Sequence, residues 1–579
     1  MKQQIAGLLA RAMTELYRQG VLAEDFSGRI QVERARQRQH GDFACNIAML
    51  LAKVAGMPPR ELAGKVVAAL PRSELVESVE IAGPGFINLK LASAAYYALI
   101  DRIREAGTAY GRSDAGGGQR VMVEFVSANP TGPLHVGHGR GAAYGDALAR
   151  VLGAAGYDAH SEYYVNDAGR QMHILALSVW LRYLDLCGET VEFPANGYQG
   201  DYIWDIGATL HRENGEAYRA DAAALFAALP EEDEERIDAL VRRCQNLLGE
   251  AGYRELFDLG LDALVVNIRT DLKQFGVEYD EWFSERVLVE SGAIQQALDV
   301  IRDNGHTYEK DGALWFRSTD FGDEKDRVVL RANGSHTYFA ADIAYHLNKV
   351  QRGFDRLINV WGADHHGYVK RVQAAFEALG HDPGGLTLLL VQFAILYRGG
   401  KKVSMSTRGG DFVTLRELRE EVGNDAARFF YAMRKPEQHM DFDLDLAKSQ
   451  SADNPVYYVQ YAHARICSVF RQLEEKGLAP AQDAVPDYAL LAESHELELL
   501  YDLSRFPELI ELAARAYEPH QIAYYLRELA NRFHTYYNAH PFLASEENMR
   551  LARLGLIDAT RQVLANGLDL LGVNAPENM

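Results

Sequence analysis

The spacing of apolar residues divides the chain into regions with different expected structures. The first twenty residues, MKQQIAGLLARAMTELYRQG, place apolar side chains every three to four positions, which predicts an amphipathic helix rather than a membrane anchor or a cleavable signal. The same spacing recurs at 46–56 and 61–70, whereas SVEIAGPGFINLKL at 78–91 is typical of strands. We therefore expect residues 1–112 to form an N-terminal α/β domain.

A different pattern begins after the glycine-rich linker DAGGGQR. Short apolar runs, each typical of a strand buried in a parallel sheet, occur at 121–130, 354–362 and 386–397. The first two runs are followed directly by helical patterns, as in repeated strand–helix units. We expect a parallel-sheet domain over 118–410, with a charged and mostly helical insertion at about 190–325.

The last part of the chain contains no further strand pattern. A connecting region is expected at 411–454, and from 455 to 579 the apolar spacing is almost wholly that of helices. The predicted fold class is therefore α/β and multidomain. It has an N-terminal α/β domain, a parallel-sheet domain with an insertion and an all-α C-terminal domain.

Charge is unevenly distributed along the chain. The formal net charge of −21 argues against a protein that coats nucleic acid nonspecifically, yet the first 115 residues hold 15 Lys and Arg against 12 Asp and Glu. Four arginines lie within ten residues of this first part: Arg29, Arg34, Arg36 and Arg38. They indicate either a solvated surface or a patch that contacts phosphates, and the sequence alone favours neither.

The four cysteines are far apart and form no CxxC pair: Cys45, Cys187, Cys244 and Cys467. This spacing predicts reduced, structural thiols, with no zinc site and no disulfide framework. No apolar run is long enough to cross a bilayer, so we expect a cytoplasmic protein without a membrane partner.

Candidate chemistry begins in SANPTGPLHVGHGRGAAYG, where the first predicted strand of the sheet gives way to a helix. His135 and His138 are three residues apart and share one face of the first helical turn, and Gly137 allows close approach to the backbone. A helix N-terminus attracts anions, so the turn suits the phosphates of a nucleoside triphosphate. Two alternatives remain, namely a zinc-binding pair and two histidines with only a structural role.

A second motif, WGADHHGY, follows a later strand of the same predicted sheet. It places Gly362, Asp364, His365 and His366 at the carboxyl end of the strand, where open α/β sheets bind ligands. Asp364 could accept hydrogen bonds from a ribose. The letters DHH also occur in manganese-dependent phosphoesterases, but no partner cluster of aspartates accompanies them here. Downstream, KKVSMSTRGG offers cations and hydroxyls on a glycine-rich loop that could close over phosphates.

Together these motifs resemble those of class I aminoacyl-tRNA synthetases, with HVGH as the first signature, GADH on a later strand and SMSTR in place of the KMSKS loop. The chain is similar to the bacterial arginyl-tRNA synthetases almost from end to end, through HGDFACNIAMLLAK, EFVSANPTGPLHVGH, YYVNDAGRQM, VGNDAARFFYAMRK and NPVYYVQYAHARI. The resemblance implies a Rossmann-like catalytic domain that activates L-arginine with ATP and Mg²⁺ and transfers it to tRNA(Arg). It further implies an N-terminal domain that binds the tRNA elbow through its D-loop, and a helical anticodon-binding domain.

The same resemblance assigns site residues. It implies ATP contacts at His135, Gly137, His138, Gly362, Asp364, Met405 and Ser406, and arginine contacts at Glu124, Asn129, His135, Tyr338, Asp342 and His366. A guanidinium is a planar cation that pairs well with carboxylates, so we expect Glu124 and Asp342 to hold it, with Tyr338 as a wall and Asn129 at the α-amino end. It also implies that arginine activation depends on bound tRNA.

One departure from the family pattern concerns the loop cations. Ser404 and Thr407 stand where the family often has lysines, and Gly132 stands where some members carry a compensating lysine. Lys401, Lys402 and Arg408 are the remaining candidates, and our hypothesis makes Lys402 and Arg408 catalytic together with His135 and His138.

The acidic helical domain must hold RNA by something other than bulk charge, because its residues from 455 hold 10 Lys and Arg against 17 Asp and Glu. Aromatic side chains are candidates for stacking on anticodon bases, although we expect most of them to lie in the helix core: Tyr517, Tyr524, Tyr525, Phe533, Tyr536, Tyr537 and Phe542.

Two other functions of the whole protein stay open, namely another HxGH nucleotidylyltransferase and a noncatalytic tRNA-binding paralogue. We expect a monomer.

Overall fold

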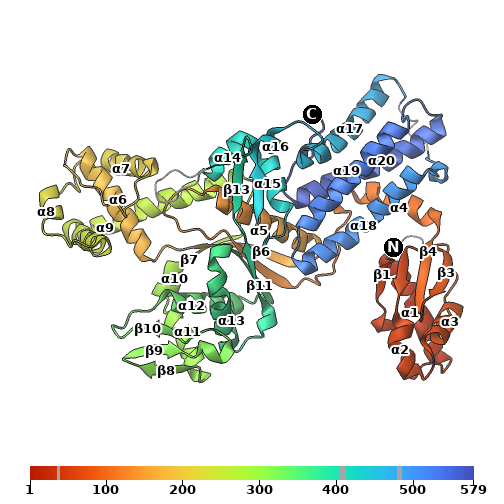
Figure 1. Ribbon diagram of the computed structural model, residues 1–579, viewed down its shortest axis with the longest axis horizontal. Helices are drawn as coiled ribbons and strands as arrows, with labels where there is room; N and C mark the ends of the chain where they lie inside the picture. Colours follow the sequence, from red (N-terminus) through yellow and green to blue (C-terminus); the bar gives the residue numbers. More distant parts are fainter. Residues whose placement is uncertain (36–39, 404–412, 479–484) are drawn as a thin grey trace.

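The computed structural model describes residues 1–579 apart from 36–39, 404–412 and 479–484, and its domains are set side by side in an elongated molecule (Figure 1). The N-terminal domain, drawn in red and orange, has a four-stranded antiparallel sheet in the order β1-β2-β4-β3. The predicted helices and strands are present as α1 (Lys2–Arg18), α2 (Ile47–Ala55), α3 (Pro59–Ala68), β3 (Val76–Ala82) and β4 (Phe86–Leu91). The domain also contains β1 (Val32–Arg34), β2 (Phe43–Cys45) and α4 (Ser93–Ala106), which were not predicted.

The central domain is built on five parallel strands in the order β12-β11-β5-β6-β7. Every residue of β5 after Arg120 is buried, as expected of a strand covered on both faces. The parallel sheet predicted from the apolar runs is thereby confirmed. The strands and their principal helices are β5 (Arg120–Phe125), α5 (Val136–Ala154), β6 (Asp158–Val165), β7 (Glu281–Ser284), α12 (Tyr338–Gln351), β11 (Arg356–Gly362), α13 (Val369–Ala378) and β12 (Leu386–Val391).

Strand β7 lies inside the expected insertion of about 190–325 and divides it into two units. The strand has only four residues, EWFS, in a charged neighbourhood, so its apolar pattern is too short to stand out in the sequence. The first unit is helical, with α6 (Arg170–Leu186), α7 (Asp201–Asn214), α8 (Ala222–Phe226) and α9 (Asp233–Gln274). The second unit has α10 (Glu285–Glu290), α11 (Ala293–Asp303) and a small antiparallel sheet of β8 (Thr307–Lys310), β9 (Ala313–Phe316) and β10 (Arg327–Leu330).

The run at 386–397, expected as one core strand, is two strands in different sheets. The chain leaves the parallel sheet after β12, and β13 (Ala394–Arg398) pairs with β14 (Lys401–Lys402) and β15 (Met440–Asp443) instead. Gly399 and Gly400 have φ angles of 56° and 70° and form the tight turn of the β13–β14 hairpin. Apolar content alone could not locate this break, because both strands are rich in Leu and other apolar residues.

The rest of the described chain is helical, as predicted from residue 455 onward. A connecting group of α14 (Leu415–Val422), α15 (Asn424–Ala432) and α16 (Leu444–Lys448) leads to the C-terminal domain, drawn in blue in Figure 1. That domain consists of α17 (Pro455–Glu475), α18 (Ser494–Ala516), α19 (His520–Ala539) and α20 (Glu547–Leu570). No helix in the described part of the chain is both long and apolar enough to span a membrane.

Two buried or half-buried arginines join the domains. Arg34 of β1 donates to both carboxylate oxygens of Glu508 on α18, at 2.9 and 3.1 Å, which favours a structural role for this arginine over contact with phosphates. Arg428 of α15, 1% exposed, pairs with Asp146 on α5 and donates to the carbonyl oxygens of Phe275 and Leu571. Arg36 and Arg38 lie outside the described residues.

Candidate active site at the carboxyl edge of the parallel sheet

The order of the parallel strands determines where a ligand can enter. From β5 the chain continues to β6 and β7 on one side, whereas β11 and β12 lie on the other, so the order in which strands are added to the parallel sheet reverses between β5 and β11. Ligands of open α/β sheets bind in the crevice at this point, beyond the carboxyl ends of the strands. The HVGH turn follows β5 and the GADHH turn follows β11, so the topology brings both motifs to the same edge.

His135 and His138 form the cap of α5. The Nδ1 atom of His135 accepts a hydrogen bond from the Gly137 amide at 3.1 Å, and Nδ1 of His138 accepts one from the His135 amide at 3.3 Å. The two rings stack with their centroids 3.8 Å apart. A Cβ atom on Gly137 would lie 2.8 Å from the His135 ring, so only glycine fits here without displacing the ring.

The protonation of the two rings follows from their surroundings. Burial, followed by the neighbouring His135, lowers the pKa of His138 to about 3. Burial also lowers the pKa of His135, and the nearby charge of Asp364 opposes that shift. Both rings are therefore neutral near pH 7, and because each Nδ1 accepts a hydrogen bond, the ring proton lies on Nε2. The turn thus holds two stacked Nε2–H donors and adds no charge of its own.

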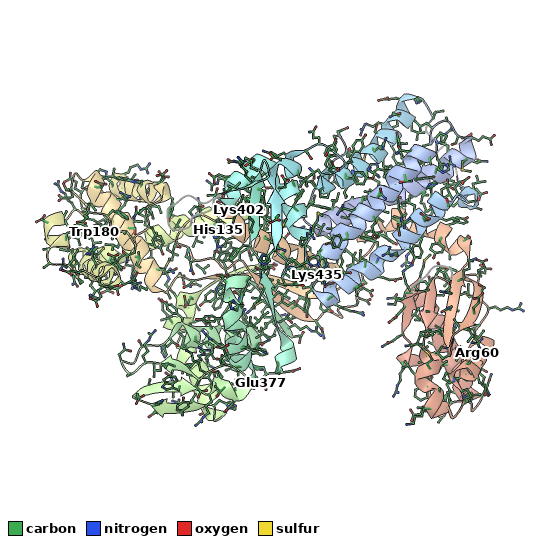
Figure 2. The ribbon with its side chains drawn as sticks, in the orientation of Figure 1. Arg60, His135, Trp180, Glu377, Lys402 and Lys435 are labelled. Atoms are coloured by element: carbon green, nitrogen blue, oxygen red, sulfur yellow. The ribbon has the colours of Figure 1, made fainter. Side chains whose placement is uncertain are left out.

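The loop that carries SMSTR is attached beside this turn. The amide of Val136 donates to the Val413 carbonyl at 3.1 Å, and the amide of Leu415 donates to the Leu134 carbonyl at 2.8 Å. On the other side of the loop, Lys402 is exposed at the end of the β13–β14 hairpin; Figure 2 labels it and His135 in the middle of the molecule. The predicted ATP residues Met405 and Ser406 and the predicted cation Arg408 lie outside the described residues.

The GADHH motif forms a short turn immediately after β11. A Cβ atom on Gly362 would lie 2.4 Å from Oδ1 of Asp364. A larger residue at 362 would therefore displace this exposed carboxylate, whereas glycine does not. His365 lies with its Nδ1 3.4 Å from the same carboxylate oxygen and lines the neighbouring cavity. His366 is exposed, its Nδ1 is 3.3 Å from the Ala363 carbonyl oxygen, and it does not line that cavity.

A cavity of about 300 Å³ opens next to this turn, between the ends of β5, β6 and β11 and the helices α10 and α12. Glu124, Tyr338, Asp342 and Gly362, four of the residues predicted from the sequence, line it together. Its volume suits a small ligand such as an amino acid. Asn129 lies outside the lining but accepts a hydrogen bond at 2.9 Å from the side-chain amide of Asn166, which belongs to it.

Three carboxyl groups face this cavity. Glu124 on β5 and Glu285 on α10 are each 5% exposed, and Asp342 on α12 is half-buried. Burial, and then the charges of Glu285 and Glu124, raise the pKa of Asp342 to about 8, while Lys349 opposes the shift. Burial likewise raises the pKa of Glu285, whose Oε2 has no hydrogen-bond partner among the described residues. The cavity is therefore well suited to a cation, which would stabilise the ionised acids.

A strained turn positions the first of these acids. Val126 and Ser127 directly follow β5 with φ angles of 68° and 39°, a region that a β-branched residue such as valine rarely adopts. The turn places the Ser127 hydroxyl so that it donates to Oε1 of Glu124 at 3.0 Å and accepts from the Tyr164 amide at 3.1 Å. Strain of this kind is common where a site must be held in one geometry.

Glu285 and Lys349 are site residues that the sequence analysis did not single out. The sequence contains a sign of each: Glu285 directly follows the short strand EWFS, and Lys349 falls seven residues after Asp342, on the same face of a helix whose buried residues are mostly apolar. The strand was too short to identify. A single lysine on a helix is usually exposed, so its burial could not be expected from spacing alone.

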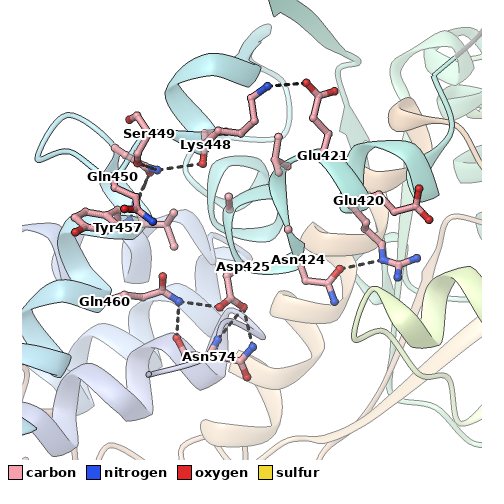
Figure 3. A pocket seen from close by; sticks show the side chains of 17 residues that line it. Glu420, Glu421, Asn424, Asp425, Lys448, Ser449, Gln450, Tyr457, Gln460 and Asn574 are labelled. Carbon is pink, nitrogen blue, oxygen red and sulfur yellow. Dashed lines mark hydrogen bonds and ion pairs between the residues drawn. The ribbon is translucent and has the colours of Figure 1, made fainter. Parts of the chain in front are cut away.

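A second cavity and a possible metal-binding cluster among the described residues are less suited to be an active site. A larger cavity of about 640 Å³ lies between α15 and α17, but Figure 3 shows that Asp425 is already held by Gln460 and Asn574, and Lys448 by Glu421. The side chains of His160, Glu162 and Glu281 approach one another closely enough for a metal ion. However, Arg352 donates to both of these carboxylates, at 2.6 and 2.7 Å, and so occupies the position of a cation.

The aromatic candidates of the helical domain separate into core and surface. Four of the seven are buried, namely Tyr525, Phe533, Tyr536 and Phe542, which confirms that most of them belong to the core. Tyr524 is 40% exposed, and Tyr517 and Tyr537 are half-buried.

The structure adds a surface group on α17 that the sequence analysis missed. The rings of Tyr457 and Tyr461 stack 5.9 Å apart at an angle of 8°, and Tyr461 is 36% exposed. The guanidinium of Arg465 lies 3.9 Å from the ring centroid of Tyr537. Exposed, stacked rings beside an arginine are suited to unpaired bases.

Comparisons with known families match almost the whole chain. A family model described as the catalytic domain of class I tRNA synthetases (R) matches residues 102–443. Residues 2–91 match the arginyl tRNA synthetase N terminal domain, and residues 459–579 match the DALR anticodon binding domain.

Individual proteins give the same result. The chain is 62% identical to an arginine–tRNA ligase of Thioalkalivibrio sulfidiphilus and 61% identical to that of Halorhodospira halophila, over the full length of both partners in each case. The crystal structure of Thermus thermophilus arginyl-tRNA synthetase is 26% identical, with a TM-score of 0.72 over all of both chains.

Proposed function

The chain belongs to the arginine–tRNA ligase family of class I aminoacyl-tRNA synthetases, and from that premise we propose how its residues share the steps of the reaction. Such a ligase activates L-arginine with ATP and joins it to tRNA, so its partners are ATP, arginine and tRNA. The observation that carries the proposal is the position of an acid-lined cavity beside two neutral histidine donors at one edge of the sheet.

In the proposed arrangement the guanidinium of arginine occupies the acid-lined cavity. Asp342 is its principal partner, assisted by Glu285 and by Glu124, because a guanidinium offers five donors in one plane. Tyr338 closes the outer wall, and Asn129, positioned by Asn166, meets the α-amino end. His365 takes the place in the cavity that the sequence analysis gave to His366. A neutral isostere of arginine would leave these buried acids unpaired, which provides selectivity.

ATP is proposed to lie across the adjoining turns. The Nε2–H groups of His135 and His138 donate to phosphate oxygens, and Gly137 and Gly362 allow close approach of the nucleotide. Asp364 accepts from the ribose hydroxyls. Met405, Ser406 and Arg408 are assigned to the ATP-facing loop from the sequence alone, with Lys402 at its beginning.

The chemistry then needs no nucleophile from the protein. The arginine carboxylate, already ionised, attacks the α-phosphorus, the bond to the β-phosphate oxygen breaks, and pyrophosphate leaves with arginyl-adenylate remaining. A terminal ribose hydroxyl of tRNA then attacks the arginyl carbonyl and releases AMP. The two histidines stabilise charge that develops on the phosphate oxygens. Mg²⁺ bound with ATP would add positive charge at the phosphates.

The remaining domains are proposed to bind tRNA. Residues 1–112 contact the elbow of the tRNA at the D-loop, residues 411–454 contact the tRNA stem, and residues 455–579 bind the anticodon. The Tyr457–Tyr461 stack supports the last assignment, because splayed bases stack on exposed rings at about 1–3 kcal/mol each. The protein is proposed to make these contacts as a monomer.

The test is ATP–pyrophosphate exchange with each of the twenty amino acids, in the presence and absence of tRNA(Arg). We expect exchange with arginine alone, and only when tRNA is present. A lack of exchange with all twenty amino acids would favour a noncatalytic paralogue, and exchange with a different nucleotidyl acceptor would favour another nucleotidylyltransferase. Deletion of residues 1–112 should raise the KM for tRNA more than the KM for ATP. Equal increases in the two KM values would contradict the assignment of this domain to the tRNA elbow.

A further inference from the structure

A lysine lies directly behind the acid-lined cavity without entering it. Lys349 on α12 is completely buried, and its Nζ donates to Oε2 of Glu124 at 2.6 Å and to Oδ1 of Asn359 at 2.9 Å. The Nζ atom also lies 4.2 Å from the ring centroid of Tyr345. Lysine is rarely this deeply buried unless its charge is paired, and here the partner is a wall of the proposed arginine site.

The lysine belongs to a continuous hydrogen-bonded chain. Asn359, also completely buried, donates through Nδ2 to Nε2 of His346 at 3.0 Å, and Nδ1 of His346 donates to the backbone carbonyl of Asp342 at 2.8 Å. Burial, followed by the charge of Lys349, lowers the pKa of His346 to about 3, so this ring is neutral. These hydrogen bonds therefore link the carboxylate of Glu124 on β5 to the turn of α12 that carries Asp342.

Lys349 also determines the charge available to a ligand. Of the three acids in the cavity, only Glu124 has a cationic side chain within ion-pair distance among the described residues. Glu285 and Asp342 have none. Burial raises the pKa of both carboxyl groups, and at Asp342 the charges of Glu285 and Glu124 add to the shift, so that its pKa is about 8. The other ionisable groups on the cavity are Tyr164, Tyr338, Tyr345, His346, His365 and Tyr368, none of which supplies a second buried cation.

We propose that Lys349 is a specificity-determining positioning residue, which fixes Glu124 as an acceptor and repels a second ammonium group from it. This inference rests on the proposed function, because it requires the arginine side chain to enter this cavity. A guanidinium spreads its charge over a plane and can share Glu124 through Oε1, whereas the compact ammonium of a lysine substrate would meet the ammonium of Lys349 across the same carboxylate. Lys349 thus disfavours lysine, the cationic amino acid most similar in charge to arginine.

The first test replaces Lys349 by methionine, which keeps most of the side-chain volume and removes the charge. In pyrophosphate exchange with tRNA(Arg) present, we expect Lys349→Met to raise the KM for arginine at least tenfold with a smaller change in kcat. The ratio of kcat/KM for arginine over lysine should fall at least tenfold. Lys370→Met, which removes an exposed lysine from α13, is the matched control and should change neither value.

The second test separates charge compensation from packing. Glu124→Gln leaves the ammonium of Lys349 unpaired, and adding Lys349→Met removes that buried charge again. We expect the double variant to have a lower KM for arginine than Glu124→Gln alone, which holds even if Lys349→Met alone does not fold. A double variant that is worse than Glu124→Gln, or an unchanged arginine-to-lysine ratio in Lys349→Met, would overturn the proposal.

A third variant distinguishes this proposal from the function on which it rests. Asp342→Asn should raise the KM for arginine whatever Lys349 does, because it changes the cavity itself. If Asp342→Asn has no effect on that KM, arginine binds elsewhere and the proposed site fails. If Asp342→Asn has its effect and Lys349→Met has none, only the role of Lys349 fails.

Discussion

The histidine turn and the acid-lined cavity are neighbours at one sheet edge, but they handle charge in opposite ways. The turn has two neutral rings whose protons are fixed by backbone amides, and it carries no formal charge of its own. The cavity holds three acids, one of them paired with a buried lysine. The cavity is suited to a charge that the substrate already carries, whereas the turn is suited to charge that grows during the reaction. Changes in the cavity should therefore appear in KM, and changes in the turn in kcat.

The largest expected effect tests the cavity. Asp342→Asn keeps the size of the side chain but removes the carboxylate proposed to pair with the guanidinium. Loss of one partner in a buried charged pair costs about 2–5 kcal/mol, so we expect the KM for arginine to rise by roughly 30- to 4000-fold. The KM for ATP should change little. Glu377→Gln, at an exposed acid on α13 (Figure 2), is the control, and an unaltered arginine KM in Asp342→Asn would remove this residue from the site.

This contrast also explains how much of the site could be predicted from sequence. The histidine turn is local, since both rings and their backbone partners lie within four residues, and its position after an apolar run could be read directly. The cavity is assembled from β5, α10, α12 and β11, which are separated by up to about 240 residues. Only the family resemblance connected Glu124 with Asp342. Glu285 and Lys349 needed the fold, because nothing local marks an acid after a four-residue strand or a buried lysine.

More of the fold than of the site could be predicted from the sequence. Parallel strands buried on both faces give continuous apolar runs, so β5 and β11 could be found, and the helical C-terminal domain followed from its spacing. The short strand β7 and the break between β12 and β13 were missed, since pairing partners far away in sequence decide them.

The second prediction tests the turn. His135→Asn retains an acceptor near the position of Nδ1, so the cap on the Gly137 amide should persist, but the Nε2–H donor is lost. Removing one donor to a developing oxyanion typically lowers kcat by about 100-fold or more, and we expect a loss of that size. The KM for arginine should be nearly unchanged, because His135, although predicted to contact arginine, does not line the cavity. His135→Ala should lower both kcat and the thermal midpoint. A His135→Asn enzyme with normal kcat and a raised arginine KM would reverse the assignment of the two regions.

The third prediction uses pH to separate the regions without mutation. Asp342 must be ionised to bind a guanidinium, and its pKa of about 8 in the empty cavity means that most molecules must lose a proton first at pH 7. The KM for arginine should therefore fall roughly tenfold between pH 7 and pH 8.5 and level off above, since the fraction ionised rises through this range. The KM for ATP should show no such trend, because the pKa of His138 is about 3 and its ring stays neutral throughout. Steady-state exchange assays across this range check both curves, and a flat arginine KM would show that the acids are already ionised.

The smallest expected effect concerns Gly362, which touches both regions. It lines the arginine cavity, yet a Cβ atom added to it would meet Oδ1 of Asp364 at 2.4 Å, on the proposed ribose side. Asp364 is exposed and can rotate away at little cost, so Gly362→Ala should raise the KM for ATP only about threefold. The KM for arginine should remain unchanged, because the nearest atoms to the new methyl group belong to Asp364 and Phe393 and not to the cavity acids. Separate titrations of ATP and arginine decide the matter. A larger change for arginine would mean that Asp364 acts on the amino-acid side, and that the boundary between the two regions lies nearer to the histidine turn.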